Sequence, residues 1–153
     1  MAQQQQRDTL TQIVVFQLGH ELYGAEIAVV REVGPLQRVT RVPRTPRYVE
    51  GVTNLRGRVI PVVDLRRRLG LEVSAPTKAT RIAVAELEAG QVGMIVDSVQ
   101  EVLRVPASAI EPPSPMMSKL DADYVQGIAK VDGRLIILLD LPRVLQREER
   151  KVV

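Results

Sequence analysis

The chain has 153 residues, which is enough for one ordinary domain or two small ones. It contains no cysteine, so thiolate metal sites, disulfide bonds and a thiol nucleophile are excluded. Its 21 basic and 18 acidic residues leave a net charge of only +3. One Phe, three Tyr and no Trp offer few stacking surfaces for single-stranded nucleic acid. Both observations favour a protein partner over a nucleic acid.

The chain begins with a polar stretch, residues 1–12, that we expect to be a disordered tail. No stretch has the apolar length of a signal peptide or a membrane span, so we expect a cytoplasmic protein without direct membrane insertion. Short apolar runs separated by turn residues then predict two sets of five strands. The first set covers residues 13–18, 22–33, 36–42, 49–55 and 58–64, and the second covers residues 81–88, 91–104, 107–111, 125–131 and 134–140.

Turns and short helices complete each set. Gly19-His20 and the pair at 89–90 are candidate hairpin turns. Asp64 and Asp140 each end a strand, where a carboxylate can cap the short helix that follows.

The two sets are related by an internal repeat. Shifted by 76 positions, YVEGVTNLRGRVIPVVDLRRRL aligns without a gap to YVQGIAKVDGRLIILLDLPRVL. The earlier FQLGHELYGAEIAVVREV aligns to AELEAGQVGMIVDSVQEV at a shift of 69, pairing Gly24 with Gly93 and Glu32 with Glu101. The second half therefore carries a longer loop, which we place in the Pro- and Ser-containing PASAIEPPSPMMSKLDAD.

Five short strands in each half predict an all-β fold of two tandem five-stranded barrels. Because barrels of this size bury little by themselves, we expect them to share an apolar junction. The expected organisation is a first barrel at 13–70, a linker at 71–80, a second barrel at 81–145 and a C-terminal helical tail at 146–153.

The apolar run VIPVV at 59–63 does not alternate with polar residues, so we expect both of its faces to be buried. Pro61 donates no backbone hydrogen bond, which places it at a sheet edge or a bulge.

Arg56 is an unusual turn residue. Asp132-Gly133 is a typical two-residue hairpin turn, and the repeat puts Arg56-Gly57 in the same place. Arginine is disfavoured at positive φ, so a long cation there is a candidate contact residue. The alternative is a three- or four-residue loop in which Arg56 points into water.

The motif NLRGRVIPVVDLR, preceded by VPRTPRYVEGVT, resembles that of CheW-like chemotaxis coupling proteins. The order and spacing of FQLGHELYGAEIAVVREV, VDSVQEVLRV, IEPP and GIAKVDGRLIILLDL agree over residues 13–145. The resemblance implies two SH3-like barrels and a non-catalytic adaptor without cofactors. Such an adaptor bridges the cytoplasmic tip of methyl-accepting chemoreceptors to the regulatory domain of the histidine kinase CheA, and is recruited to membrane receptor arrays.

The resemblance also implies site residues. The receptor-facing groove would use Ile27, Val30, Glu32, Val33, Arg56, Val99 and Val102. The kinase-facing surface would lie around Thr40, Val42 and Pro43, in a loop that Arg44 and Arg47 make more basic than is typical of the family.

The same residues have plainer interpretations. The four valines at equivalent places in the repeat, Val30, Val33, Val99 and Val102, can be ordinary core, or some can fill the barrels while others line a groove. For Glu32 we favour the rim of that groove, and for Glu101 a solvated strand end.

Two other functional classes are less well supported. For catalysis the only histidine, His20, lies at an expected hairpin tip, and capping explains the aspartates at 64, 97 and 140, so neither a catalytic nor a metal site is expected. A nucleic-acid-binding barrel is the alternative function, since arginines recur every three residues at 38, 41, 44 and 47. In an extended chain that spacing alternates faces and makes no single basic stripe.

Overall fold

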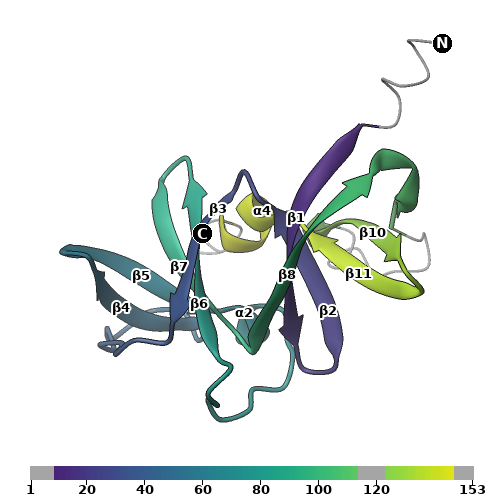
Figure 1. The fold of residues 1–153 in the computed structure, drawn as a ribbon. Helices are drawn as coiled ribbons and strands as arrows, with labels where there is room; N and C mark the ends of the chain where they lie inside the picture. The colour runs from purple at the N-terminus through teal and green to yellow at the C-terminus, as the bar shows by residue number, and fades with distance from the viewer. Residues whose placement is uncertain (1–8, 114–122, 147–153) are drawn as a thin grey trace. The chain divides into compact units, whose positions relative to one another are not determined.

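The computed structural model describes residues 9–113 and 123–146, which form two β-sheets and short helices (Figure 1). The strands are β1 (Leu10–Leu18), β2 (Glu21–Glu26), β3 (Val30–Pro35), β4 (Val49–Leu55), β5 (Arg58–Asp64), β6 (Arg81–Leu87), β7 (Gly90–Val96), β8 (Ser98–Pro106), β9 (Ile110–Glu111), β10 (Val125–Val131) and β11 (Arg134–Leu139). The helices include α2 (Leu65–Arg68), the 3-10 helix η1 (Ala107–Ala109) and α4 (Leu141–Gln146).

Parts of three expected segments lie outside the described residues: the first eight residues of the tail, 114–122 within the longer loop, and 147–153 of the C-terminal helical tail. Residues 10–12 belong to β1, so the expected tail is too long at its end.

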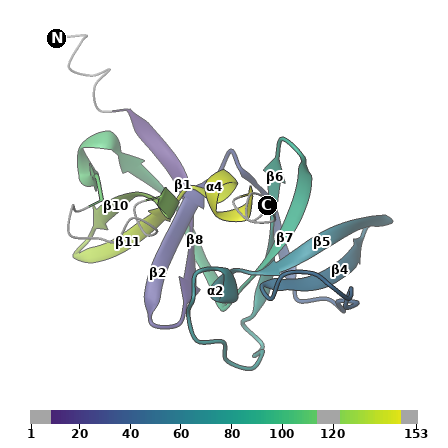
Figure 2. The same ribbon diagram turned by 180° about the vertical axis from the view of Figure 1, so that it is seen from behind.

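One sheet has five strands in the order β3-β6-β7-β5-β4. All five lie in a compact unit made of Phe16–Glu21 and Ala28–Gln100. The pairs β3–β6, β6–β7 and β4–β5 are antiparallel, whereas β5 and β7 are parallel. The helix α2 follows β5 directly and is also seen from behind (Figure 2).

The other sheet has six strands in the order β8-β1-β2-β11-β10-β9. Most of it lies in a second compact unit, made of the described parts of 1–15, 22–27 and 101–153. The pair β2–β11 is parallel, like β5–β7 in the five-stranded sheet. When the two halves are aligned by the repeat, each strand of the five-stranded sheet has an equivalent at the same place in the six-stranded sheet. The sixth strand, β9, corresponds to the single β-bridge at Thr40.

Each sheet is built from both halves of the chain, which corrects the expected boundaries of the two barrels. β6 and β7, from the second half, lie between β3 and β5 of the first. In the six-stranded sheet β1 and β2, from the first half, join β8 to β11 of the second. The parallel pairs show the exchange at equivalent positions, since Val62 pairs with Gly93 and Leu138 pairs with Gly24. The division at 71–80 therefore does not separate the two sheets, and an apolar junction between the barrels stays a prediction.

Both hairpins identified by the repeat are confirmed. β4 and β5 are joined by the two-residue turn Arg56-Gly57, and β10 and β11 by Asp132-Gly133. Each hairpin also has a shift in strand register ahead of its turn. The shift lies between Val49 and Gly51 in β4 and between Val125 and Gly127 in β10. The Gly19-His20 turn joins β1 to β2 as expected, and the turn expected at 89–90 lies one residue earlier.

Four expected strands are wrong in detail. Of residues 107–111, only Ile110–Glu111 form a strand, β9, and Ala107–Ala109 form the 3-10 helix η1. Residues 22–33 form two strands, β2 and β3, separated by a turn at 27–29. Residues 91–104 likewise form β7 and the start of β8, because the chain bends at Asp97. Residues 36–42 form a loop whose single β-bridge joins Thr40 to Val52.

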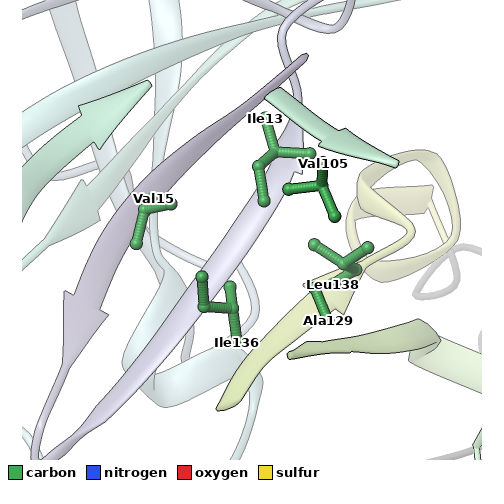
Figure 3. Packing of buried hydrophobic residues seen from close by; sticks show 6 residues of the cluster. All are labelled: Ile13, Val15, Val105, Ala129, Ile136 and Leu138. Atoms are coloured by element: carbon green, nitrogen blue, oxygen red, sulfur yellow. The ribbon is translucent and has the colours of Figure 1, made fainter. Parts of the chain in front are cut away.

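Each unit has its own apolar core. In the second unit Ile13, Val15, Val105, Ala129, Ile136 and Leu138 pack together (Figure 3). In the first, Ile60, Val62, Ile82, Val84 and Ile95 form the equivalent cluster. These aliphatic side chains stabilise the sheets by removing apolar surface from water.

The run VIPVV is buried throughout on one face but only at Val63 on the other, so the expectation of two buried faces is wrong for most of the run. Val59 is 69% exposed and Pro61 is exposed, while Ile60 and Val62 are buried. β5 lies between β4 and β7, but its pairing with β7 starts at Val62. Both backbone groups of Val52, the β4 partner of Pro61, bond to Thr40, so Val52 and Pro61 form a non-hydrogen-bonded pair. Pro61 therefore lies where β5 is locally an edge, as predicted.

Candidate partner-binding surfaces

The β4–β5 turn holds Arg56 in a left-handed conformation. Its φ is 52°, close to the 51° of Asp132 in the equivalent turn. The turn has two residues, so the alternative of a longer loop is excluded. The amide of Gly57 donates to Asn54 Oδ1 at 2.8 Å, which stabilises the turn from within. A hairpin this tight leaves the Arg56 side chain extending from its tip.

Arg56 forms an ion pair with Glu32 of β3. Its Nη1 lies 2.9 Å from Glu32 Oε1, and the side chains are 77% and 29% exposed. A pair this exposed contributes about 0–1 kcal/mol to stability. It sets the direction of the guanidinium without occupying all five of its N–H donors.

A pocket of about 220 Å³ lies beside this ion pair and is called here the hairpin pocket. Its lining combines the core side chains Ile60, Ile82 and Val84 with Glu32, Val33 and Arg56. Val33 is 41% exposed although it is apolar. The volume is below that of ordinary small-molecule sites, and it suits one or two side chains of a partner protein.

The remaining expected receptor-facing residues are not brought to this pocket. Val30 is a core residue at 7% exposure, and Val99 in β8 is half-buried. Ile27 and Val102 are exposed in the other unit, so their part in one groove with Arg56 stays a prediction. Glu101, expected to be solvated, forms an exposed ion pair with Arg134 at 3.1 Å.

The loop at 36–48 carries the expected kinase-facing residues. Thr40 exchanges two backbone hydrogen bonds of 2.8 Å with Val52, which fixes the loop to β4. Val42 and Pro43 are exposed and line an open hollow of about 640 Å³. Thr40 lies outside the lining of that hollow.

Three of the four regularly spaced arginines line the same hollow, which corrects the expectation that they alternate faces. Arg41, Arg44 and Arg47 belong to its lining, together with Arg67 of α2, and Arg38 does not. The expectation assumed an extended chain, whereas this loop turns at 43–44 and at 47–48. We call the hollow lined by Arg41, Arg44, Arg47 and Arg67 the arginine hollow.

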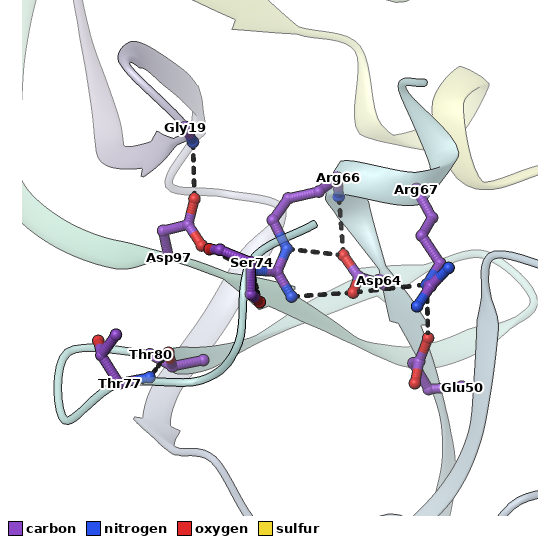
Figure 4. A network of polar contacts seen from close by, with 9 residues as sticks. All are labelled: Gly19, Glu50, Asp64, Arg66, Arg67, Ser74, Thr77, Thr80 and Asp97. Atoms are coloured by element: carbon purple, nitrogen blue, oxygen red, sulfur yellow. Dashed lines mark hydrogen bonds and ion pairs between the residues drawn. The ribbon is translucent and has the colours of Figure 1, made fainter. Parts of the chain in front are cut away.

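A buried polar network close to α2 is a feature that sequence reasoning missed (Figure 4). Arg66 is 4% exposed and makes a two-point contact with Asp64 through Nε and Nη2, each at 2.9 Å. Its Nη1 also donates to Asp97 at 2.7 Å and to the Ser74 carbonyl at 3.2 Å. Asp64 caps α2 as predicted, and Asp97 accepts from the Gly19 amide.

The network ties the linker at Ser74 and the β1–β2 turn to the five-stranded sheet. Hydrogen bonding to Asp64 raises the pKa of Arg66 above its ordinary value, against the opposing effect of burial. A raised pKa in the folded state gives stability that is lost only as pH rises through that pKa. Arg66 therefore stays charged at every pH below the ordinary range of arginine, and its role is structural.

Of the candidate catalytic side chains, Asp64 and Asp97 meet at Arg66, where both are held in its ion pairs. His20 is exposed in its hairpin turn, and Asp140 caps α4 by accepting from the Arg143 amide at 3.2 Å. Within 9–113 and 123–146, no three His, Asp or Glu side chains are arranged to hold a metal ion. In that part of the chain no helix is long and apolar enough to cross a membrane.

Comparison with known proteins identifies the family. The model of the CheW-like domain matches residues 12–149. The chain belongs to the CheW-like domain family. It is 35% identical over 140 residues to the chemotaxis protein CheW of Rhizobium meliloti, covering 92% of this chain and 90% of that one. It is 36% identical to the chemotaxis protein CheW of Bacillus subtilis over 137 residues, covering 89% and 87%.

A solved CheW structure has the same fold. The scaffolding protein TtCheW from Thermoanaerobacter tengcongensis superposes with a TM-score of 0.83 and is 40% identical, covering 90% of this chain and 94% of that one. The CheW-like family therefore accounts for the strand exchange between the two halves as a property of the fold. One comparison within the sequence could have pointed to Arg66, since its equivalent in the repeat is Pro142, which cannot form such pairs.

Proposed function

We propose that this chain is a non-catalytic adaptor that couples methyl-accepting chemoreceptors to the histidine kinase CheA. Membership of the CheW-like family makes it a protein of chemotaxis signal transduction. The observation that carries the finer assignment is the presence of two separate surfaces on one unit, the hairpin pocket and the loop at 36–48. An adaptor needs two such surfaces, because its partners must be held at the same time.

The hairpin pocket supports the receptor contact. An amphipathic helix binds by placing its apolar anchors in a hydrophobic groove, and a helix of the receptor tip is the proposed occupant. Here Val33 and the core side chains supply the apolar lining, and Arg56 and Glu32 supply charges beside it. Ile27, Val99 and Val102 extend the same contact in this proposal, and Val30 supports it from the core.

The loop at 36–48 supports the kinase contact. Its bridge to β4 and its two prolines, at 43 and 46, restrict its conformations, so little freedom is lost when a partner binds. Val42 is 39% exposed and offers an apolar contact at the tip. The regulatory domain of CheA is the proposed occupant, and receptor binding brings the complex to membrane arrays.

A pair of single substitutions tests the assignment of two surfaces. Val33→Asp and Val42→Asp each place a charge at an exposed valine, so neither should unfold the chain. We expect Val33→Asp to weaken binding of a receptor tip fragment and leave CheA binding unchanged, and Val42→Asp to do the reverse. Surface plasmon resonance with each partner measures both affinities. If the folded parent chain binds neither partner, the adaptor assignment is wrong.

A further inference from the structure

The arginine hollow holds an unusual amount of uncompensated charge. Glu50 is its one acidic lining residue, and it is already paired with Arg67 at 3.1 Å. Arg41, Arg44 and Arg47 are exposed and have no carboxylate within ion-pairing distance among the described residues. Three unpaired cations thus gather at one hollow, in a chain whose whole net charge is only +3.

Arg44 adopts a backbone conformation that disfavours arginine. Its φ is 66°, in the turn closed by a hydrogen bond from Thr45 Oγ1 to the Val42 carbonyl at 3.1 Å. Of the described residues other than glycine, only Arg44, Arg56 and Asp132 have positive φ. Asparagine or glycine would fit the position at less cost, about 1 kcal/mol. The strain indicates that the Arg44 side chain is retained for a contact, because the turn gains nothing from it.

We propose that the arginine hollow binds an acidic segment of the kinase regulatory domain, so that this adaptor selects its kinase by charge. The proposal rests on the kinase contact proposed above and names the chemistry of the partner at that contact. Guanidinium groups bind carboxylates through two parallel hydrogen bonds, which gives both attraction and geometric selectivity. Three unpaired arginines require a partner segment rich in Asp or Glu.

The lining of the hollow favours a protein over a nucleic acid or a membrane. It contains no aromatic side chain on which a base could stack. Val42, Pro43, Pro46 and Val49 lie between the arginines, and a mixture of apolar side chains and arginine is typical of protein interfaces.

Charge contacts at an exposed surface act mainly on association. They raise the rate of encounter and lose strength as salt screens them. The affinity for the kinase regulatory domain should therefore fall as salt is raised, and the fall should depend on these three residues.

The test is a triple variant, Arg41→Gln, Arg44→Gln and Arg47→Gln, in the full chain. A control with Arg31→Gln, Arg58→Gln and Arg104→Gln removes the same net charge from exposed positions outside the hollow. Binding of the CheA regulatory domain is measured by stopped-flow and by titration at about 50 mM and about 300 mM NaCl, which bracket strong and weak screening.

We expect the hollow variant to bind about tenfold more weakly at low salt, mostly through slower association, and to lose most of its salt dependence. The control variant should bind within about twofold of the parent chain, since distant charges are screened. The single variant Arg44→Asn should keep or gain thermal stability and still lose affinity.

Three results would overturn the proposal. Equal losses in the hollow and control variants would assign the effect to net charge. Unchanged kinase affinity with lost binding to phosphatidylglycerol vesicles, or to an oligothymidylate strand, would assign the hollow to a different anionic partner. No binding of the kinase domain by the unmodified chain at either salt concentration would contradict the kinase contact itself.

Discussion

Arg56 and Asp132 occupy equivalent turns with nearly the same backbone angle, yet only Asp132 suits that angle chemically. The repeat made Arg56 recognisable from the sequence, because its equivalent is a standard turn residue. The sequence could not identify its ion-pair partner in the same way. Glu32 is 24 residues away in the chain, and it lies beside Arg56 only because of the place of β3 in the fold. Short-range turn chemistry is readable in sequence, whereas the partner of an exposed side chain depends on the assembled sheet.

Arg56→Asn should separate binding from stability. Asparagine tolerates a positive φ, and the ion pair lost with Glu32 is exposed, so the free energy of unfolding should change by less than about 1 kcal/mol. Affinity for a receptor tip fragment should fall by about tenfold, as for other arginines at interface centres. Urea denaturation and isothermal titration calorimetry provide the two measurements.

Asp132→Asn is the matched control, because it makes the same turn residue in the equivalent hairpin. It should leave receptor affinity unchanged. A loss of several kcal/mol of stability in Arg56→Asn, with affinity preserved, would make Arg56 a structural residue.

Arg66 is predicted to be the most sensitive charged side chain for stability. Arg66→Met leaves Asp64 buried without its two-point partner, so the free energy of unfolding should fall by about 3–5 kcal/mol. Arg67→Met removes a neighbouring side chain that is 48% exposed and should cost about 1 kcal/mol or less. Chemical denaturation of both variants at neutral pH gives the comparison, and equal losses would contradict the structural role of the network.

At the scale of elements, the positions of β4, β5, β6 and β10 follow closely from the apolar runs and the turn residues around them. The exceptions have physical causes. The run at 22–33 contains no turn-favouring residue at its bend, 27–29, so nothing in the local sequence marks that break between strands. In 91–104 only the pair Asp97-Ser98 marks the break, and neither glycine nor proline accompanies it. Residues 36–42 have strand-like composition but lie in a loop that approaches the β4 backbone at Thr40 through a single β-bridge.

That close approach explains Gly51. A Cβ atom on Gly51 would lie 1.9 Å from the Thr40 carbonyl oxygen, and its φ of 146° is unfavourable for other residues. A Cβ atom on Gly127, its equivalent, would likewise lie 2.8 Å from the Glu111 carbonyl oxygen. Both glycines are therefore required where a further segment joins the hairpin.

Gly51→Ala should lower the free energy of unfolding by about 1–3 kcal/mol, because the loop must move away from β4. Gly34→Ala is the matched control, since nothing lies within 4 Å of the added Cβ. It should be neutral or slightly stabilising. Thermal unfolding followed by circular dichroism compares them, and a neutral Gly51→Ala would show that the Thr40 bridge contributes little.

At the scale of the whole molecule, the sequence shows the duplication but not the exchange of strands between its halves. The repeat identifies which strands are equivalent, and hydrophobic pattern identifies their buried faces. Neither reports which hairpins share a sheet, because the parallel pairs β5–β7 and β2–β11 join residues about 30 and more than 100 positions apart. The boundaries 13–70 and 81–145 therefore describe the repeat and not the folded units.

The exchange predicts that neither half folds alone. A fragment of residues 1–75 contains β3, β4 and β5 but lacks β6 and β7, which separate β3 from β5 in the sheet. We expect this fragment and its complement, residues 76–153, each to lack a cooperative thermal transition, and an equimolar mixture to regain one. A cooperative transition in the isolated first fragment would show that the repeat is an independent folding unit.

The central claim is that the chain links receptor to kinase, and a bridging pull-down tests it most directly. A receptor cytoplasmic fragment is immobilised and incubated with CheA, with and without this chain, and retained CheA is quantified. CheA should be retained well above background only when the chain is present, and Val33→Asp or Val42→Asp should each abolish that gain. Retention of CheA that is unchanged by the folded chain, at concentrations where it binds either partner, would contradict the account.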